Sequence, residues 1–198
     1  MKLAFVHLMR TGGSYAVGQL HACGLTPICA WSQGLSRDWT RGELLELLQT
    51  EQAGVIHNHS VGWDREAIAF AREHGWSIFA IARDPVDQLA SLYHFWYGPG
   101  KAEPVGVDEF IRRQLDRSHA DCRTRVWEIP AWHGLVDRWI AYRPRLYGAL
   151  QQAFGLEGPE IGPIDGASRL ETPSAEAAAA MRKSEFYARY LEVLSRCE

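Results

Sequence analysis

The first half of the chain alternates between two patterns of hydrophobic and polar residues. In one, apolar residues occupy consecutive positions, which is typical of parallel strands buried on both faces. In the other, apolar residues recur at helical spacing. The patterns predict strands over 2–8, 25–31, 53–60 and 76–82, and helices over 14–23, 41–52, 64–75 and 83–96. Such alternation predicts an α/β fold in three layers, with a central, mainly parallel sheet flanked by helices.

The second half is predicted to be mostly helical. The helical pattern continues to about residue 156 and is interrupted by a loop over 97–106. A loop rich in glycine and proline, 155–173, then precedes one last helix that runs to the C-terminus. No internal repeat stands out, and 198 residues is an ordinary length for one domain, so we expect a single domain over 1–198.

Composition and charge narrow the class of protein. The chain has 46% hydrophobic and 23% charged residues, as soluble globular proteins do, and its net charge of −3 does not support a nucleic-acid partner. The apolar run at 2–8 is too short for a signal peptide or a membrane span. The four cysteines form no C-x-x-C pair. We therefore expect a cytoplasmic protein with reduced thiols, no membrane span and no structural zinc.

Three polar clusters follow predicted strands, at residues 10–14, 57–60 and 83–91. The carboxyl ends of parallel strands meet at one edge of a sheet, and ligands of α/β proteins bind beyond that edge. The convergence of the three clusters is the main functional signal in the sequence.

The first cluster, Arg10-Thr11-Gly12-Gly13-Ser14, has the composition of an anion-binding loop. Two glycines let the backbone approach an anion closely, and the helix that follows presents unpaired N–H groups and the positive end of its dipole. Arg10 adds a charge, and Thr11 and Ser14 add hydroxyl donors. The nucleoside-triphosphate signature G-x-x-x-x-G-K-[ST] is absent. An ordinary tight turn between strand and helix is the alternative interpretation.

The stretch FVHLMRTGGSY, residues 5–15, resembles the 5′-phosphosulfate loop of sulfotransferases that use 3′-phosphoadenosine 5′-phosphosulfate (PAPS) as donor. The resemblance implies a P-loop-like fold in which residues 10–15, up to Tyr15, hold the phosphosulfate. The chain departs from the common pattern at Met9, where many members have proline, and at Arg10, where many have lysine.

The stretch FAIARDPVDQLASLYHFW, residues 79–96, resembles the 3′-phosphate motif of the same family. Arg83 and Ser91 occupy its arginine and serine positions. An arginine at a strand end and a serine on the following helix can bind one phosphate jointly. A second arginine is common in the family where this chain has Gln88. A helix cap with an ion pair is the alternative interpretation of Arg83. The two motifs occur in the same order as in the family. The nearest resemblance is to the branch of the family that sulfates glycans.

His57 and His59 lie two residues apart at the end of a predicted strand, so they share one face of the sheet. Histidine suits general-base catalysis near neutral pH. Uronosyl sulfotransferases of glycans carry a similar H-x-H whose second histidine is the base. That resemblance implies His59 as the base, with His57 assisting it or contacting the acceptor. A structural role and a metal site are the alternatives, although no further ligand lies close in sequence, and Glu43, Glu46 and Asp64 remain alternative bases.

Two later segments contribute further candidates. His94, Trp96 and Lys101 border the loop after residue 96 and are candidates for contacting the acceptor, with packing on the core as the alternative. By resemblance, Ser168 and Arg169 belong to a loop that covers the adenine and the 3′-phosphate.

The resemblance implies an enzyme that transfers a sulfuryl group from PAPS to a hydroxyl or amine of a small-molecule or glycan acceptor. Adenosine 3′,5′-bisphosphate is the second product, and Arg10 with the loop amides stabilises the charge that develops on it. No metal is implied. Two alternatives remain open. One is a non-catalytic or degenerate nucleotide-binding member of the fold, and the other is a nucleotide kinase-like P-loop protein, which would be expected to carry the lysine that this loop lacks.

Overall fold

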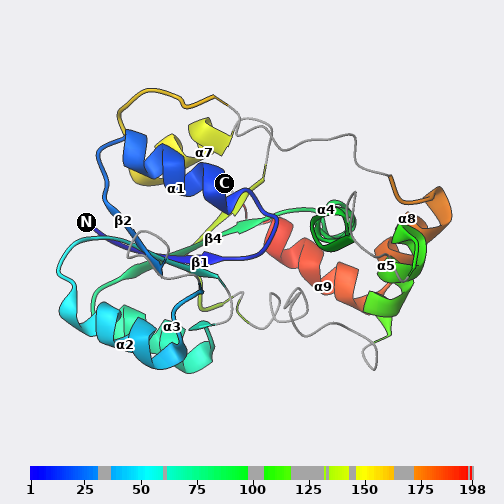
Figure 1. Cartoon of the computed structure of the whole chain (residues 1–198), viewed down its shortest axis with the longest axis horizontal. Coiled ribbons are helices and arrows are strands. Elements are labelled where there is room, and N and C mark those ends of the chain that lie inside the picture. Colours follow the sequence, from blue (N-terminus) through cyan, green and yellow to red (C-terminus); the bar gives the residue numbers. More distant parts are fainter. Residues whose placement is uncertain are drawn as a thin grey trace.

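Five parallel strands form a sheet at the centre of the molecule (Figure 1). The computed structural model describes residues 1–30, 37–59, 62–97, 105–116, 132, 134–142, 146–162, 172–195 and 197. The strands are β1 (Lys2–His7), β2 (Pro27–Cys29), β3 (Gly54–His59), β4 (Ser77–Ala82) and β5 (Arg138–Ala141). They lie in the order β2-β3-β1-β4-β5, and all four pairings are parallel. The predicted central parallel sheet is confirmed.

Helices cover both faces of this sheet, which completes the three layers of the α/β fold (Figure 1). On one face lie α1 (Gly13–Ala22) and α7 (Leu146–Phe154), and on the other lie α2 (Arg41–Thr50) and α3 (Arg65–Glu73). A further group gathers beside the sheet, at the right of Figure 1: α4 (Pro85–Tyr97), α5 (Val107–Leu115), α8 (Ala175–Arg182) and α9 (Glu185–Leu194). None of the helices in the described ranges is long and apolar enough to cross a membrane.

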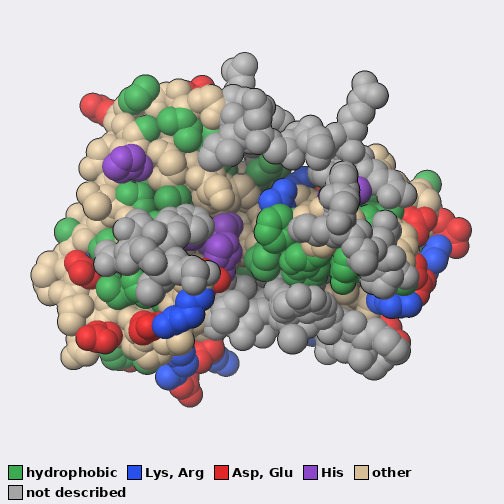
Figure 2. Space-filling model, viewed as in Figure 1, with side chains coloured by type: hydrophobic (Ala, Val, Ile, Leu, Met, Phe, Trp, Pro, Cys, Tyr) green, Lys and Arg blue, Asp and Glu red, His purple; other side chains and the backbone are tan. Residues whose placement is uncertain are grey.

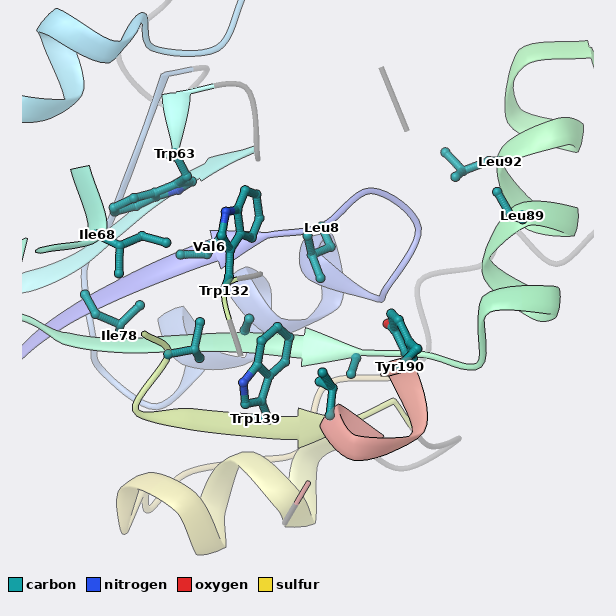
Figure 3. Close-up of a cluster of buried hydrophobic side chains, with 14 of the residues drawn as sticks. Val6, Leu8, Trp63, Ile68, Ile78, Leu89, Leu92, Trp132, Trp139 and Tyr190 are labelled. Atoms are coloured by element: carbon teal, nitrogen blue, oxygen red, sulfur yellow. The ribbon is translucent and has the colours of Figure 1, made fainter. Parts of the chain in front are cut away.

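The side chains of β1 alternate between two buried cores. Phe5 packs under α1 and α7, whereas Val6 and Leu8 pack with Trp63 in the core that α2 and α3 cover (Figure 3). This is the two-residue period of a strand with both faces buried. His7 continues the series of Phe5, so β1 places the His7 imidazole on the α1 face at the carboxyl end of the sheet.

The second half contains a strand where the sequence pattern predicts a helix. That prediction is wrong for residues 138–141, which form β5 beside β4. Trp139 and Ile140 are both buried, and periodicity cannot distinguish such a short apolar run from a piece of helix. The single last helix is also wrong, because α8 ends at Arg182 and Ser184 caps a separate helix, α9, by accepting a hydrogen bond from Tyr187 N.

The order of the strands brings two connections together at the carboxyl edge. From β1 the chain passes through α1 toward β2 on one side of the sheet. From β4 it continues through α4 and α5 toward β5 on the other side. Because β1 and β4 are neighbours, the two connections leave adjacent strand ends in opposite directions. Ligands of α/β proteins bind at such a switch point, so the loop after β1 and the start of α4 form the expected ligand-binding edge.

Candidate functional site

The loop after β1 passes through a left-handed conformation at Arg10, whose φ is 62°. A non-glycine residue costs about 1–2 kcal/mol in this region, so neighbouring contacts must hold it. Arg83 Nη1 donates a hydrogen bond to Arg10 O at 3.1 Å, and Gln88 Nε2 donates one to Met9 O at 2.8 Å. Both donors belong to the segment that follows β4. The second predicted motif therefore fixes the backbone of the first.

The side chains of the two motifs also meet. Arg10 Nε donates to Ser91 Oγ at 3.0 Å, and Ser91 is only 2% exposed. Burial, and then the nearby positive charge of Arg83, lower the pKa of Arg10. No carboxylate among the described residues forms a salt bridge with either arginine, and Arg83 Nε is buried without a described hydrogen-bond partner. Two adjacent guanidinium groups without a described counter-ion favour the binding of an anion.

Two exposed aromatic rings support these guanidinium groups. The Arg10 guanidinium lies 5.2 Å from the centroid of Phe95, and that of Arg83 lies 4.7 Å from the centroid of Tyr142. Phe95 is 48% exposed and Tyr142 is 39% exposed. Tyr142 also packs on the loop itself, because a Cβ added to Gly12 would lie 2.8 Å from Tyr142 Cε2. Gly12, with a φ of 84°, is therefore required both for the turn and for this close approach.

A histidine cluster, made of His7, His57 and His59, lies beneath the first turn of α1. His57 and His59 share one face of β3, as predicted, and His7 pairs with His59 in the register of β1 and β3. The rings of His7 and His59 are 4.3 Å apart, and His57 Nε2 shares a hydrogen bond with His7 Nδ1 at 2.8 Å. A Cβ on Gly13 would lie 2.0 Å from His7 Nε2. The cluster is thus in direct contact with the loop.

Asp38, which the sequence did not single out, completes the cluster on its outer side. Its Oδ1 lies 2.6 Å from His59 Nδ1. The backbone beside it is fixed by Asn58, whose amide accepts from Trp39 N at 3.0 Å and donates to Trp39 O at 3.1 Å. Figure 2 shows histidine side chains at the surface near the middle of the view, beside a group of hydrophobic side chains.

Electrostatics affects the pKa values of the inner histidines, His7 and His57, differently from that of Asp38 on the outer side. Burial, followed by repulsion from His59, lowers the pKa of His57 to about 3, and burial also holds the pKa of His7 well below its ordinary value. Burial alone would raise the pKa of Asp38, but the hydrogen bond from His59 and the nearby imidazoles lower it below its ordinary value. At neutral pH the inner imidazoles are therefore neutral and Asp38 is ionised.

Acid is expected to destabilise the fold through these inner imidazoles. A histidine whose pKa is lower in the folded state than in the unfolded state takes up a proton on unfolding. Its contribution to the free energy of unfolding is therefore complete above the unfolded pKa of 6.5 and is lost as the pH falls toward the folded pKa of about 3. His57 alone should lower the free energy of unfolding by roughly 2–3 kcal/mol between pH 7.5 and pH 4.5. Urea titrations of the wild type and His57→Phe at both pH values measure this. The variant should lose less stability in acid, and equal losses would contradict the assignment.

The remaining predicted phosphate-loop residues differ in their surroundings. Ser14 is exposed in the first turn of α1, where its hydroxyl can meet a ligand. The Tyr15 hydroxyl donates to Ile161 O at 3.4 Å. The prediction that Thr11 offers a hydroxyl donor does not fit its geometry, because this side chain is buried and donates to Leu8 O at 2.7 Å.

The predicted acceptor-side residues are only partly described. His94 packs edge-on against Tyr93, and Trp96 packs edge-on against Phe110 on α5. The position of Trp96 matches the alternative interpretation, because this side chain packs against the core. Lys101, Ser168 and Arg169 lie outside the described residues.

The alternative carboxylate bases serve structural roles in two of three cases. Glu43 forms a capping box with Thr40 at the start of α2 and an ion pair with Arg37. Asp64 caps α3 and pairs with Arg41. Glu46 is exposed on α2. Asp38, by contrast, contacts the histidine cluster directly through His59.

The described residues contain no group of three or more His, Cys, Asp or Glu side chains that could hold a metal ion. None of the protein-family models, curated proteins or solved structures compared with the chain matches it. The class of protein is therefore defined by fold and site alone. It is an α/β protein with a parallel sheet, and its switch point holds a glycine loop, two arginines and a histidine cluster.

Proposed function

We propose that this protein is a PAPS-dependent sulfotransferase. The observation that carries the proposal is the 3.0 Å hydrogen bond from Arg10 Nε to Ser91 Oγ, which joins residues 81 positions apart in the sequence. Arg10 is the charged residue of the first motif and Ser91 is the serine of the second. A nucleotide that carries one anionic group at its 5′ position and another at its 3′ position must contact both motifs at once. Arg10 and Ser91 therefore have to lie close enough to reach the same ligand.

The binding scheme assigns one motif to each end of the donor. The 5′-phosphosulfate lies against the backbone N–H groups at the start of α1, where the helix dipole favours negative charge, with Arg10 beside it. Arg83 and Ser91 bind the 3′-phosphate through charge-assisted hydrogen bonds. Gln88 adds no charge to this site. Its side-chain amide instead donates a hydrogen bond to Met9 O, which stabilises the loop.

The transfer step uses the histidine cluster. The acceptor oxygen or nitrogen attacks the sulfur in line, and the bond from sulfur to the bridging oxygen of the 5′-phosphate breaks. Adenosine 3′,5′-bisphosphate leaves with the electron pair of that bond, and Arg10 stabilises its developing charge. His59 takes the acceptor's proton as general base. His59 suits this role better than His57, because the side chain of His59 is 23% exposed whereas His57 is buried.

Calorimetry with three nucleotides tests the proposal. We expect adenosine 3′,5′-bisphosphate to bind at least about tenfold more tightly than 5′-AMP, since a hydrogen bond to a charged group contributes roughly 1.5–3 kcal/mol. Tighter binding of ATP with magnesium would overturn the proposal in favour of a nucleotide kinase-like protein. Incubation with radiolabelled PAPS and a panel of sugars, phenols and amines then tests transfer. Bisphosphate binding without release of sulfate or sulfation of any acceptor would identify a non-catalytic nucleotide-binding protein.

Removing Arg83 should weaken the bisphosphate selectively. We expect Arg83→Ala to raise the Kd for adenosine 3′,5′-bisphosphate by about 10- to 100-fold. The Kd for 5′-AMP should rise by less than about threefold, because 5′-AMP is affected only through the lost hydrogen bond to Arg10 O. Arg72→Ala is the matched control, because Arg72 forms its ion pair with Asp137 at the opposite edge of the sheet. Calorimetry on both variants provides the comparison, and equal losses for the two nucleotides in Arg83→Ala would contradict the 3′-phosphate role.

A further inference from the structure

The contact between Asp38 and His59 has the geometry of a carboxylate that orients a catalytic imidazole. Asp38 Oδ1 and His59 Nδ1 are 2.6 Å apart, which is a short, charge-assisted hydrogen bond. Asp38 is ionised at neutral pH, so it accepts and His59 Nδ1 donates. A neutral His59 then carries its proton on Nδ1 and its lone pair on Nε2.

The position of Asp38 is itself fixed by the strand that carries the histidines. Asn58 points to the opposite face of β3 from His57 and His59 and makes two hydrogen bonds with the backbone of Trp39, next to Asp38. Asn58 is 1% exposed, and Trp63 Nε1 donates to its carbonyl at 3.2 Å. Two consecutive residues of β3 therefore locate the pair, because Asn58 fixes the backbone beside Asp38 and His59 is the other partner.

The inner side of the His59 ring is fixed as well. His7 lies against it at 4.3 Å between ring centroids, and the hydrogen bond between His57 and His7 holds His7 in place. His7 in turn contacts Gly13 in the first turn of α1. Among the described residues, the charged and titratable groups around His59 are Asp38 on the outer side and His7 and His57 on the inner side, with Arg10 near His7.

We propose that Asp38 is a positioning residue that holds His59 as the Nδ1–H tautomer and stabilises the imidazolium formed when His59 Nε2 takes the acceptor's proton. This inference rests on the proposed sulfotransferase function and extends it by assigning a second residue to the proton-transfer step. The proton passes from the acceptor to Nε2, the Nδ1 proton stays on the imidazole, and Asp38 remains a carboxylate throughout. Asp38 therefore acts on the proton transfer through His59 and takes no part in bonding to sulfur.

A spectroscopic experiment tests the pair without any need for turnover. An imidazole Nδ1–H that is hydrogen-bonded to a carboxylate should give a strongly downfield proton resonance. We expect this resonance in the wild type and in Glu73→Gln, which removes an exposed carboxylate from the far end of α3. It should disappear in Asp38→Asn and return in Asp38→Glu. Absence of the resonance from the wild type, or its persistence in Asp38→Asn, would overturn the assignment.

A kinetic experiment tests the catalytic consequence with water as the acceptor, so that no acceptor needs to be identified. Release of radiolabelled sulfate from PAPS should fall by about 10- to 100-fold in Asp38→Asn, with the Kd for adenosine 3′,5′-bisphosphate within about twofold of wild type. Asp38→Glu should recover part of the rate, and Glu73→Gln should match the wild type. An unchanged rate in an Asp38→Asn variant that has lost the downfield resonance would overturn the positioning role.

The two experiments distinguish failure of this inference from failure of the proposed function. If the wild type binds no bisphosphate and releases no sulfate from PAPS, the sulfotransferase proposal is overturned, and the catalytic role of Asp38 with it. If the wild type binds bisphosphate and releases sulfate while Asp38→Asn does so equally well, the proposed function stands and only the role of Asp38 is overturned.

Discussion

Replacing His59 with glutamine is expected to reduce sulfuryl transfer from PAPS by about 10²- to 10⁴-fold, which is the usual contribution of a general base. Glutamine keeps a polar side chain of similar length but cannot take up a proton near neutral pH. The groups proposed to bind phosphate, Arg10, Arg83 and Ser91, do not contact His59 through any described hydrogen bond. The Kd for adenosine 3′,5′-bisphosphate should therefore stay within about threefold of wild type. Single-turnover assays and calorimetry measure the two quantities separately.

The matched control is His21→Gln, an exposed histidine in the last turn of α1, at the far end of that helix from the loop. Its activity should equal that of the wild type. Full activity in His59→Gln would assign proton removal to another group, and Glu46 would then be the first of the alternative bases to replace. A loss of bisphosphate binding in His59→Gln equal to the loss in rate would show that the histidine supports the donor site rather than the proton transfer.

Gly13→Ala is expected to destabilise the protein by about 3 kcal/mol, or roughly 6–12 °C in Tm. The added Cβ would lie 2.0 to 2.3 Å from three ring atoms of His7, well inside van der Waals contact. The imidazole cannot move away easily, because His7 is 4% exposed and His57 holds its Nδ1. Either the ring or the first turn of α1 must shift, so bisphosphate affinity should also fall by about tenfold or more.

Gly148→Ala provides the control for this substitution. Gly148 lies within α7, and an added Cβ there meets no atom within 4 Å, so alanine should be neutral or slightly stabilising. The double variant Gly13→Ala with His7→Ala should recover much of the stability that Gly13→Ala loses, because the clash is then removed. Thermal melts of the wild type, Gly13→Ala, His7→Ala and the double variant give the coupling energy. Equal melting temperatures for Gly13→Ala and Gly148→Ala would contradict the proposed contact.

The parts of the site that the sequence predicts are those carried by strand ends. The positions of Arg10, Arg83 and the two histidines of β3 follow from the location of each strand and from the rule that parallel strands end at one edge. Asp38 could not be found in this way. It lies 21 residues before His59, in the connection between β2 and α2, and no hydrophobic period describes the path of that connection.

His7 was hidden for a different reason. It occupies the last position of an apolar strand, where its period assigns it to the core, and nothing local indicates a partner. Its partners are set by the register of β1 and β3, which places His7 opposite His59 and Phe5 opposite His57. An ionisable residue at the end of a buried strand, next to a glycine loop, is the one signal that could have identified it. The strand β5 shows the same limit in the fold, since its four residues are placed by pairing with β4 rather than by their own pattern.

The alternation of His57, Asn58 and His59 has a consequence for how β3 finds its register. Side chains of a strand change faces at every residue, so a slip of one position along β1 would move both imidazoles into the apolar core that contains Trp63 and would turn Asn58 toward α1. The Asn58 bonds to Trp39 and the Asp38–His59 pair would be lost together, and two imidazoles would be buried without their present partners. Mispairing of β3 would therefore cost free energy, because polar side chains on both faces of the strand would lose their hydrogen-bond partners. The same three residues therefore contribute both to the candidate site and to the register of β3.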